Sequence, residues 1–147
     1  MNDVSSTPKV TVRREIAASA EELFDAWLDP ASLAMWMRPG DTPRTTAKVD
    51  PRVGGEFEIV MHLESGPVRH SGSYQEIDRP RRLAFTWISP HTKQTASRVA
   101  VDFHARRGTT EVVVTHELLP SLDAVAAHTR GWSGILKLLE QTFGGVS

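Results

Sequence analysis

The sequence predicts one α+β domain, in which a curved antiparallel sheet of about six to seven strands packs with two short helices and one long C-terminal helix over its concave face. Two observations support this class. Apolar and polar residues alternate in short segments from Thr45 to Leu118, which is the period of strands. The last part of the chain instead carries an apolar stripe at helical spacing, formed by Trp132, Ile135, Leu136, Leu139 and Phe143. No linker or repeat divides the 147 residues, so we expect a single domain at residues 9–147 after a disordered tail at residues 1–8.

The first predicted elements are a strand and two short helices. Lys9–Ala17 alternates as a strand, and Ser19 followed by Glu22 forms a capping box that starts a helix. The pair Asp29-Pro30 ends this helix and starts a second one, which Pro39-Gly40 ends. The apolar faces are Leu23, Ala26 and Trp27 in the first helix and Leu33, Trp36 and Met37 in the second.

The central part of the chain is predicted to be an antiparallel meander, because its strands are joined by short turns. A loop at Ser89–Thr95 interrupts the series. The strands with clear bounds are Glu56–Leu63, His70–Ile77, Arg82–Ile88, Ser97–Ala105 and Thr110–Leu118. Their covered face is expected to hold Phe57, Ile59, Met61, Leu63, Leu83, Phe85, Trp87, Val99, Val101, Phe103, Val112, Val114, His116 and Leu118.

The last predicted element is a helix from Leu122 to Phe143. Ser121 offers an N-cap, and Gly144-Gly145 ends the helix where a left-handed residue is wanted. At 1.5 Å per residue this helix is roughly 33 Å long, enough to cross a whole sheet.

Composition removes several classes of function. The formal net charge is −1 and no basic patch lies beside a stacking aromatic, so neither nucleic acid nor a membrane surface is an expected partner. The chain has no cysteine, which removes disulfides, thiolate nucleophiles and cysteine-bound zinc. No apolar run reaches the roughly 18 residues of a membrane helix, and residues 1–8 lack the apolar core of a signal peptide. A cytoplasmic protein is expected.

A set of short motifs, ordered along most of the chain, resembles a known family. The motifs are ELFDAW at 22–27, Asp29-Pro30, Trp36, Gly54-Gly55 with Phe57, Gly72-x-Tyr74-x-Glu76-Ile77, Pro80-x-x-Leu83-x-Phe85-Thr86-Trp87, Thr115-His116 and His128-x-x-Gly131-Trp132-x-x-x-Leu136. The chain resembles the bacterial activator of Hsp90 ATPase homologue 1-like (AHSA1-like) proteins, of the START-like (SRPBCC) helix-grip superfamily. The resemblance implies the helix-grip fold, whose members bind lipids, hormones or polyketides or assist chaperones. Met37-Arg38-Pro39 stands where relatives often have a paired tryptophan, so a different cavity mouth is expected.

The space between sheet and helix is the candidate site, because a helix touches a curved sheet along a line. A cavity and a filled core would have the same apolar lining, and it is chiefly the resemblance that favours the cavity. Gly131 and Gly134 add modest support, since glycine inside a helix costs about 1 kcal/mol and suggests space or close approach beside Trp132. The predicted ligand-binding residues are Trp36, Phe57, Ile59, Met61, Tyr74, Phe85, Trp87, Val101, Val114, His116, His128, Trp132 and Leu136.

Catalytic motifs are lacking. No histidine pair or carboxylate–histidine set has metal-ligand spacing, and there is no nucleophile elbow, dinucleotide fingerprint or P-loop, so neither a metal nor a cofactor is expected. His116 and His128 are the catalytic candidates, because two imidazoles near an apolar space can orient a ligand or act as acid and base. Satisfied core histidines are the simpler interpretation.

Three functions remain open. The leading hypothesis is a cofactor-free protein that binds a small, largely apolar or aromatic molecule. The alternatives are a module that modulates an Hsp90-type chaperone and a small enzyme of the polyketide cyclase or hydratase type, and the chain is interpreted as more a binding protein than an enzyme. The sequence leaves the choice between a monomer and a homodimer open.

Overall fold

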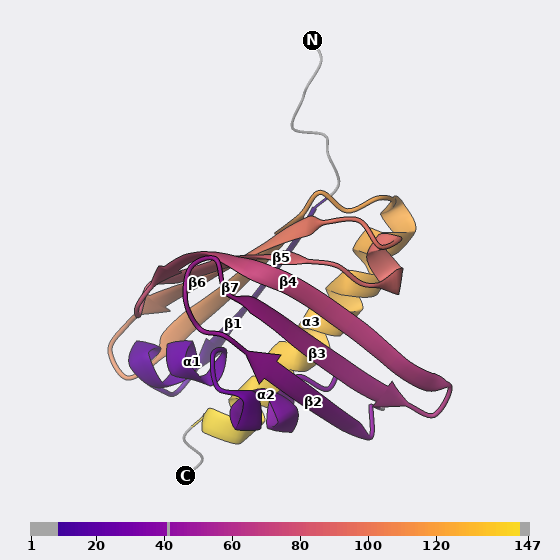
Figure 1. Ribbon diagram of the computed structural model, residues 1–147. Coiled ribbons are helices and arrows are strands. Elements are labelled where there is room, and N and C mark those ends of the chain that lie inside the picture. Colours follow the sequence, from indigo (N-terminus) through magenta and orange to yellow (C-terminus); the bar gives the residue numbers. More distant parts are fainter. Residues whose placement is uncertain (1–8, 41, 145–147) are drawn as a thin grey trace.

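The strands form one antiparallel sheet in the order β1-β7-β6-β5-β4-β3-β2, so the first two strands of the chain lie at its opposite edges. The computed structural model describes residues 9–40 and 42–144 (Figure 1). The tail predicted at residues 1–8 lies outside them. The elements are β1 Val10–Ile16, α1 Ala20–Ala26, α2 Pro30–Trp36, β2 Arg44–Val49, β3 Glu56–Leu63, β4 Gly66–Asp78, β5 Arg82–Trp87, the short 3₁₀ helix η2 Pro90–Thr92, β6 Ser97–Ala105, β7 Thr110–Glu117 and α3 Leu122–Phe143.

The predicted fold class is confirmed. Figure 1 shows α3 lying along one face of the curved sheet, with α2 beside its later turns. The predicted N-caps form: Ser19 accepts a hydrogen bond from the backbone of Glu22, and Ser121 accepts one from Ala124. Pairing of β6 with β7 sets His116 opposite Val99, so the imidazole shares the covered face with the valines around it.

Two local predictions are wrong. Leu118 was expected to continue the covered face, but β7 ends at Glu117, and Leu118 has a φ of 63° and is 55% exposed. The chain turns there toward the N-cap of α3. Gly144 was expected in the left-handed region, but its φ of −64° is ordinary, and its N–H returns to the carbonyl of Glu140. The structure also bounds β2, which the sequence analysis left undivided, and it starts β4 before His70.

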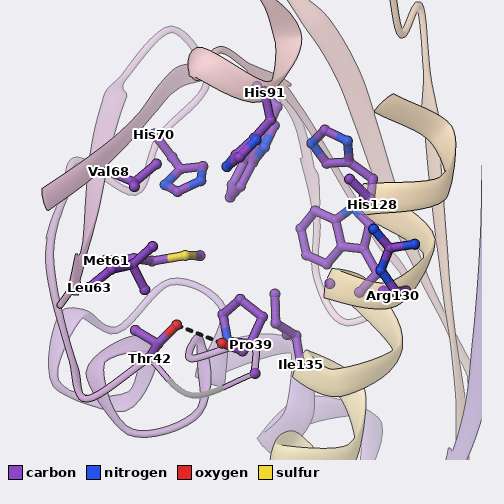
Figure 2. Close-up of a pocket in the computed structure, with 15 residues that line it drawn as sticks. Pro39, Thr42, Met61, Leu63, Val68, His70, His91, His128, Arg130 and Ile135 are labelled. Atoms are coloured by element: carbon purple, nitrogen blue, oxygen red, sulfur yellow. Dashed lines mark hydrogen bonds between the residues drawn. The ribbon is translucent and has the colours of Figure 1, made fainter. Parts of the chain in front are cut away.

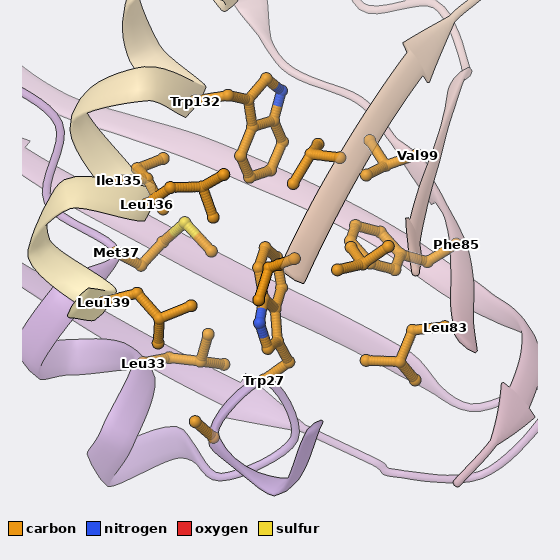
Figure 3. Close-up of a cluster of buried hydrophobic side chains, with 14 of the residues drawn as sticks. Trp27, Leu33, Met37, Leu83, Phe85, Val99, Trp132, Ile135, Leu136 and Leu139 are labelled. Atoms are coloured by element: carbon orange, nitrogen blue, oxygen red, sulfur yellow. The ribbon is translucent and has the colours of Figure 1, made fainter. Parts of the chain in front are cut away.

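The middle of the space between α3 and the sheet is filled with side chains (Figure 3). Trp27, at the end of α1, lies edge-on to Trp36 at a ring separation of 4.8 Å and stacks on Trp132 at 6.1 Å. Around Trp27, Met37 and Phe85 there remains a void of only about 10 Å³, at the lower limit for one water molecule. The centre of the fold is therefore a packed core.

Candidate functional site

An open pocket of about 420 Å³ lies at one end of the space between sheet and helix, beyond the packed centre. Figure 2 shows Met61, Val68 and His70 on one wall, with Arg130 and Ile135 of α3 opposite and His91 at one end. The complete lining is Pro39, Gly40, Thr42, Met61, Leu63, Val68, His70, Trp87, His91, Ala127, His128, Arg130, Gly131, Trp132 and Ile135. Most of these side chains are apolar, as in small-molecule sites generally.

Two glycines of α3, Gly131 in the pocket wall and Gly134 one turn later, have different surroundings. A β-carbon built on Gly131 would meet no other atom within 4 Å, whereas one on Gly134 would touch the backbone at Gly40 and Pro39 at 3.8–4.0 Å. Gly134 therefore faces the segment after α2 with room for a β-carbon in ordinary contact, and Gly131 borders open space. Both glycines were singled out in the sequence, and the structure gives them these two different surroundings.

His116 is fully occupied by hydrogen bonds inside the protein. The indole N–H of Trp132 donates to its Nδ1 at 3.0 Å, so Nδ1 bears no hydrogen. The hydrogen of the neutral ring is then on Nε2, which donates to the Ser97 hydroxyl at 2.7 Å, and Ser97 donates onward to the carbonyl of Trp87 at 2.6 Å. This chain connects α3 to three neighbouring strands.

His116 is also held neutral by its surroundings. The side chain is 0% exposed, and burial, assisted by the nearby His128, lowers its pKa to about 3. Protonation of Nδ1 would place two donors face to face, since Trp132 already points its N–H there. His116 therefore fixes the helix on the sheet and has no free nitrogen with which to act as acid or base.

His128 lies differently, on the wall of the pocket. Its ring stands edge-on to that of His116 at 4.6 Å, and its Nδ1 is 2.8 Å from the carbonyl oxygen of Ala124, one turn earlier in α3. Burial lowers its pKa, the Ala124 carbonyl counteracts this in part, and His91 lowers it further. Among residues 9–40 and 42–144, no hydrogen bond engages its Nε2.

His70 is a second neutral imidazole in the wall. It is 4% exposed, and burial lowers its pKa to about 4, although the carbonyls of Ile59 and Val68 favour the protonated form. Its ring packs against Trp87 at 5.0 Å. The imidazoles of His70 and His128 thus give the pocket polarity without charge, and the cation at its edge is the exposed side chain of Arg130.

The predicted site residues separate into two groups. Met61, Trp87, His128 and Trp132 line the pocket. The other predicted residues are buried outside it: Trp36, Phe57, Ile59, Tyr74, Phe85, Val101, Val114, His116 and Leu136. Trp36 is 0% exposed and donates to Ser32, so it does not form the mouth. Tyr74 is buried, which raises the pKa of its phenol.

Sequence reasoning missed several wall residues, chiefly Val68, His70 and His91. His70 was placed on a strand, but its side was not assigned, and His91 was assigned to a loop. A usable signal was present for Leu63, which continues the covered face of β3 beyond Met61 and so indicates that the lining extends to the strand end.

Neither a metal site nor a membrane-spanning helix is found in the part of the chain that the structure describes. Among the described residues no three histidine, aspartate or glutamate side chains are placed to hold a metal ion. No helix within residues 9–40 and 42–144 has the length and apolarity required to cross a membrane.

Comparison with known proteins agrees with this architecture. Residues 17–144 match the sequence profile of the family described as activator of Hsp90 ATPase homolog 1-like protein. A Chromobacterium violaceum protein superposes with a TM-score of 0.80 at 20% identity, covering 95% of this chain and 99% of that one. An AHSA1-like protein of Aeromonas hydrophila gives 0.75 at 26% identity, covering 90% of each chain. An Hsp90 activator of Plasmodium falciparum gives 0.73 at 23% identity, covering 92% of this chain and 95% of that one. A search of curated proteins finds no match.

Proposed function

The chain belongs to the activator of Hsp90 ATPase homolog 1-like family, and from this premise we propose that it binds a small, largely apolar molecule in the pocket beside Gly131. The observation that carries the proposal is the combination of an open space of about 420 Å³ with walls of Met61, Trp87, Trp132 and Ile135. Apolar area removed from water contributes about 25 cal/mol per Å², so such walls favour an apolar ligand. Among the described residues that line the pocket, none has the arrangement of a nucleophile with its base, and binding is the activity that the geometry supports.

Filling the pocket from Gly131 tests the proposal. We expect the neutral dye N-phenyl-1-naphthylamine, whose emission rises on leaving water, to bind saturably to the wild type. Gly131→Leu adds four carbon atoms to the wall, which should displace about as many atoms of the dye. Each displaced ligand atom costs about 0.3 kcal/mol of binding free energy, so the affinity should fall about tenfold. The same substitution should raise helix stability by about 1 kcal/mol, so unfolding would not explain the loss.

Gly134→Ala is the matched control. It removes a glycine from the same helix, and its β-carbon makes only ordinary contact with the chain at Gly40. We expect equal or greater stability and unchanged dye binding. Absence of saturable binding in the wild type, or equal affinities in the wild type and Gly131→Leu, would contradict the proposal.

A second candidate function is interaction with an Hsp90-type chaperone, which the family description and the likeness to the Plasmodium falciparum activator favour. The test is the ATPase rate of a purified bacterial Hsp90 with and without the chain. A saturable change in that rate, retained in Gly131→Leu, would separate this function from the pocket.

A further inference from the structure

The hydrogen position on His128 is fixed by its own helix. The carbonyl oxygen of Ala124, 2.8 Å from Nδ1, can only accept a hydrogen bond, so Nδ1 carries the hydrogen. A neutral imidazole has a single N–H, and Nε2 is therefore left with a bare lone pair. Burial and the neighbouring His91 both lower the pKa of this side chain, which keeps the ring neutral near pH 7.

No neighbouring group on the described chain satisfies this lone pair. On the β7 side stands His116, but both of its nitrogens are engaged by Trp132 and Ser97. On the η2 side stands His91, whose ring centre is 6.5 Å away and whose side chain is exposed. On the β4 side His70 is neutral, and on α3 itself Arg130 is exposed. His128 Nε2 thus presents an unused acceptor in the wall of a mostly apolar pocket.

We infer that the ligand is a neutral apolar molecule bearing a hydroxyl or N–H group, and that His128 Nε2 accepts the hydrogen of that group. This inference rests on the proposed binding function and specifies its ligand class. An apolar ligand that covers Nε2 removes it from water, and an acceptor desolvated without a partner is costly, so a ligand that supplies the donor is favoured over one of the same shape that lacks it. A carboxylate ligand is disfavoured, because its oxygens and Nε2 are all acceptors.

Matched probes test the inference by competition with N-phenyl-1-naphthylamine at about pH 7.5, where His128 is neutral. 2-Naphthol offers a donor, 2-methoxynaphthalene does not, and 2-naphthoate is an anion. Replacing His128 by Phe keeps a ring but removes the acceptor. We expect the affinity ratio of 2-naphthol to 2-methoxynaphthalene to fall about three- to tenfold in His128→Phe, the effect of one net hydrogen bond. His104→Phe, at an exposed position outside the pocket, should leave the ratio unchanged.

The outcomes separate the inference from the proposed function. If the dye binds but the ratio is the same in the wild type and His128→Phe, the inference is wrong and the binding function stands. Tighter binding of 2-naphthoate than of 2-naphthol would also overturn it, and would assign recognition to the cation Arg130 instead. Failure of the dye and of all three probes to bind would overturn both. As a further check, the preference for 2-naphthol should be lost when acid protonates Nε2, because the acceptor then becomes a donor.

Discussion

The hydrogen bond between Trp132 and His116 offers a measurable test of how α3 is held on the sheet. Trp132→Phe retains an aromatic ring but removes the donor, and it leaves Nδ1 of a 0% exposed histidine without a partner. His116→Leu removes the acceptor and leaves the indole N–H unpaired, while Ser97 keeps its bond to the carbonyl of Trp87. The double variant removes both partners at once.

The expected magnitudes follow from burial. A buried polar group left unsatisfied costs about 1–3 kcal/mol, so each single variant should lose at least that much, with an added loss in Trp132→Phe for the smaller ring. Removing both partners avoids the unsatisfied group. The double variant should therefore be more stable than the sum of the single losses predicts, by about 1–2 kcal/mol.

Urea unfolding followed by circular dichroism measures all four proteins without depending on tryptophan emission, which the substitution itself alters. Substitutions at independent sites change the free energy of unfolding additively to within about 0.5 kcal/mol. An interaction energy below that value would refute the assignment of a buried Trp132–His116 hydrogen bond, and with it the neutral tautomer deduced for His116.

Two further predictions concern stability. The pKa values of buried His116 and His70 are lowered to about 3 and about 4 from 6.5, so below pH 6.5 the unfolded chain takes up protons that the folded chain does not. The free energy of unfolding should therefore have its full value above pH 6.5. Below that pH it should fall by up to about 1.4 kcal/mol per pH unit for each of the two histidines. His70→Gln should reduce the dependence of the urea midpoint on pH, whereas His104→Gln, at an exposed position, should not. A wild-type midpoint that stays constant down to about pH 5 would contradict the prediction. Separately, a β-carbon on Gly72 would lie 1.9 Å from the backbone oxygen of Thr86, so Gly72→Ala should cost about 1–3 kcal/mol or more, whereas Gly131→Ala should stabilise by about 1 kcal/mol. Thermal unfolding of the pair should give shifts of opposite sign.

The architecture could be predicted because each element carries its own local signal. Alternation identified β3, β5, β6 and β7, and the stripe from Trp132 to Leu139 identified the buried face of α3. The errors at Leu118 and Gly144 lie at element ends, where the path of the chain toward its next partner overrides the local pattern. The bounds of β2 were missed because the covered side of this strand carries Thr45 and Ala47, which give little apolar signal, although its burial alternates residue by residue.

The candidate site could be predicted only in part, because periodicity gives the side of a strand and not the position along it. Phe57 and Met61 share one face of β3, yet Phe57 lies in the packed core and Met61 lines the pocket. The same holds on α3, where Trp132 reaches the pocket and Leu136, one turn later, does not. What separates them is the entry of Trp27, Leu33 and Met37, from α1 and α2 and their ends, into one part of the space under the sheet, which no local pattern encodes.

The position of Trp27 explains why the open space is at one end. This indole comes from the end of α1, outside the sheet and α3, and it enters the gap between them, stacking on Trp132 and meeting Trp36. Its buried N–H has no partner within the described chain, a cost of about 1–3 kcal/mol that packing must offset, so the ring acts as a filler of volume. Trp132 and Trp87, 5.3 Å apart, then form the boundary, with the packed core on one side and the pocket on the other. Because His116 fixes Trp132 in that boundary through its indole N–H, the hydrogen-bond chain that holds α3 on the sheet also sets the inner limit of the space available to a ligand.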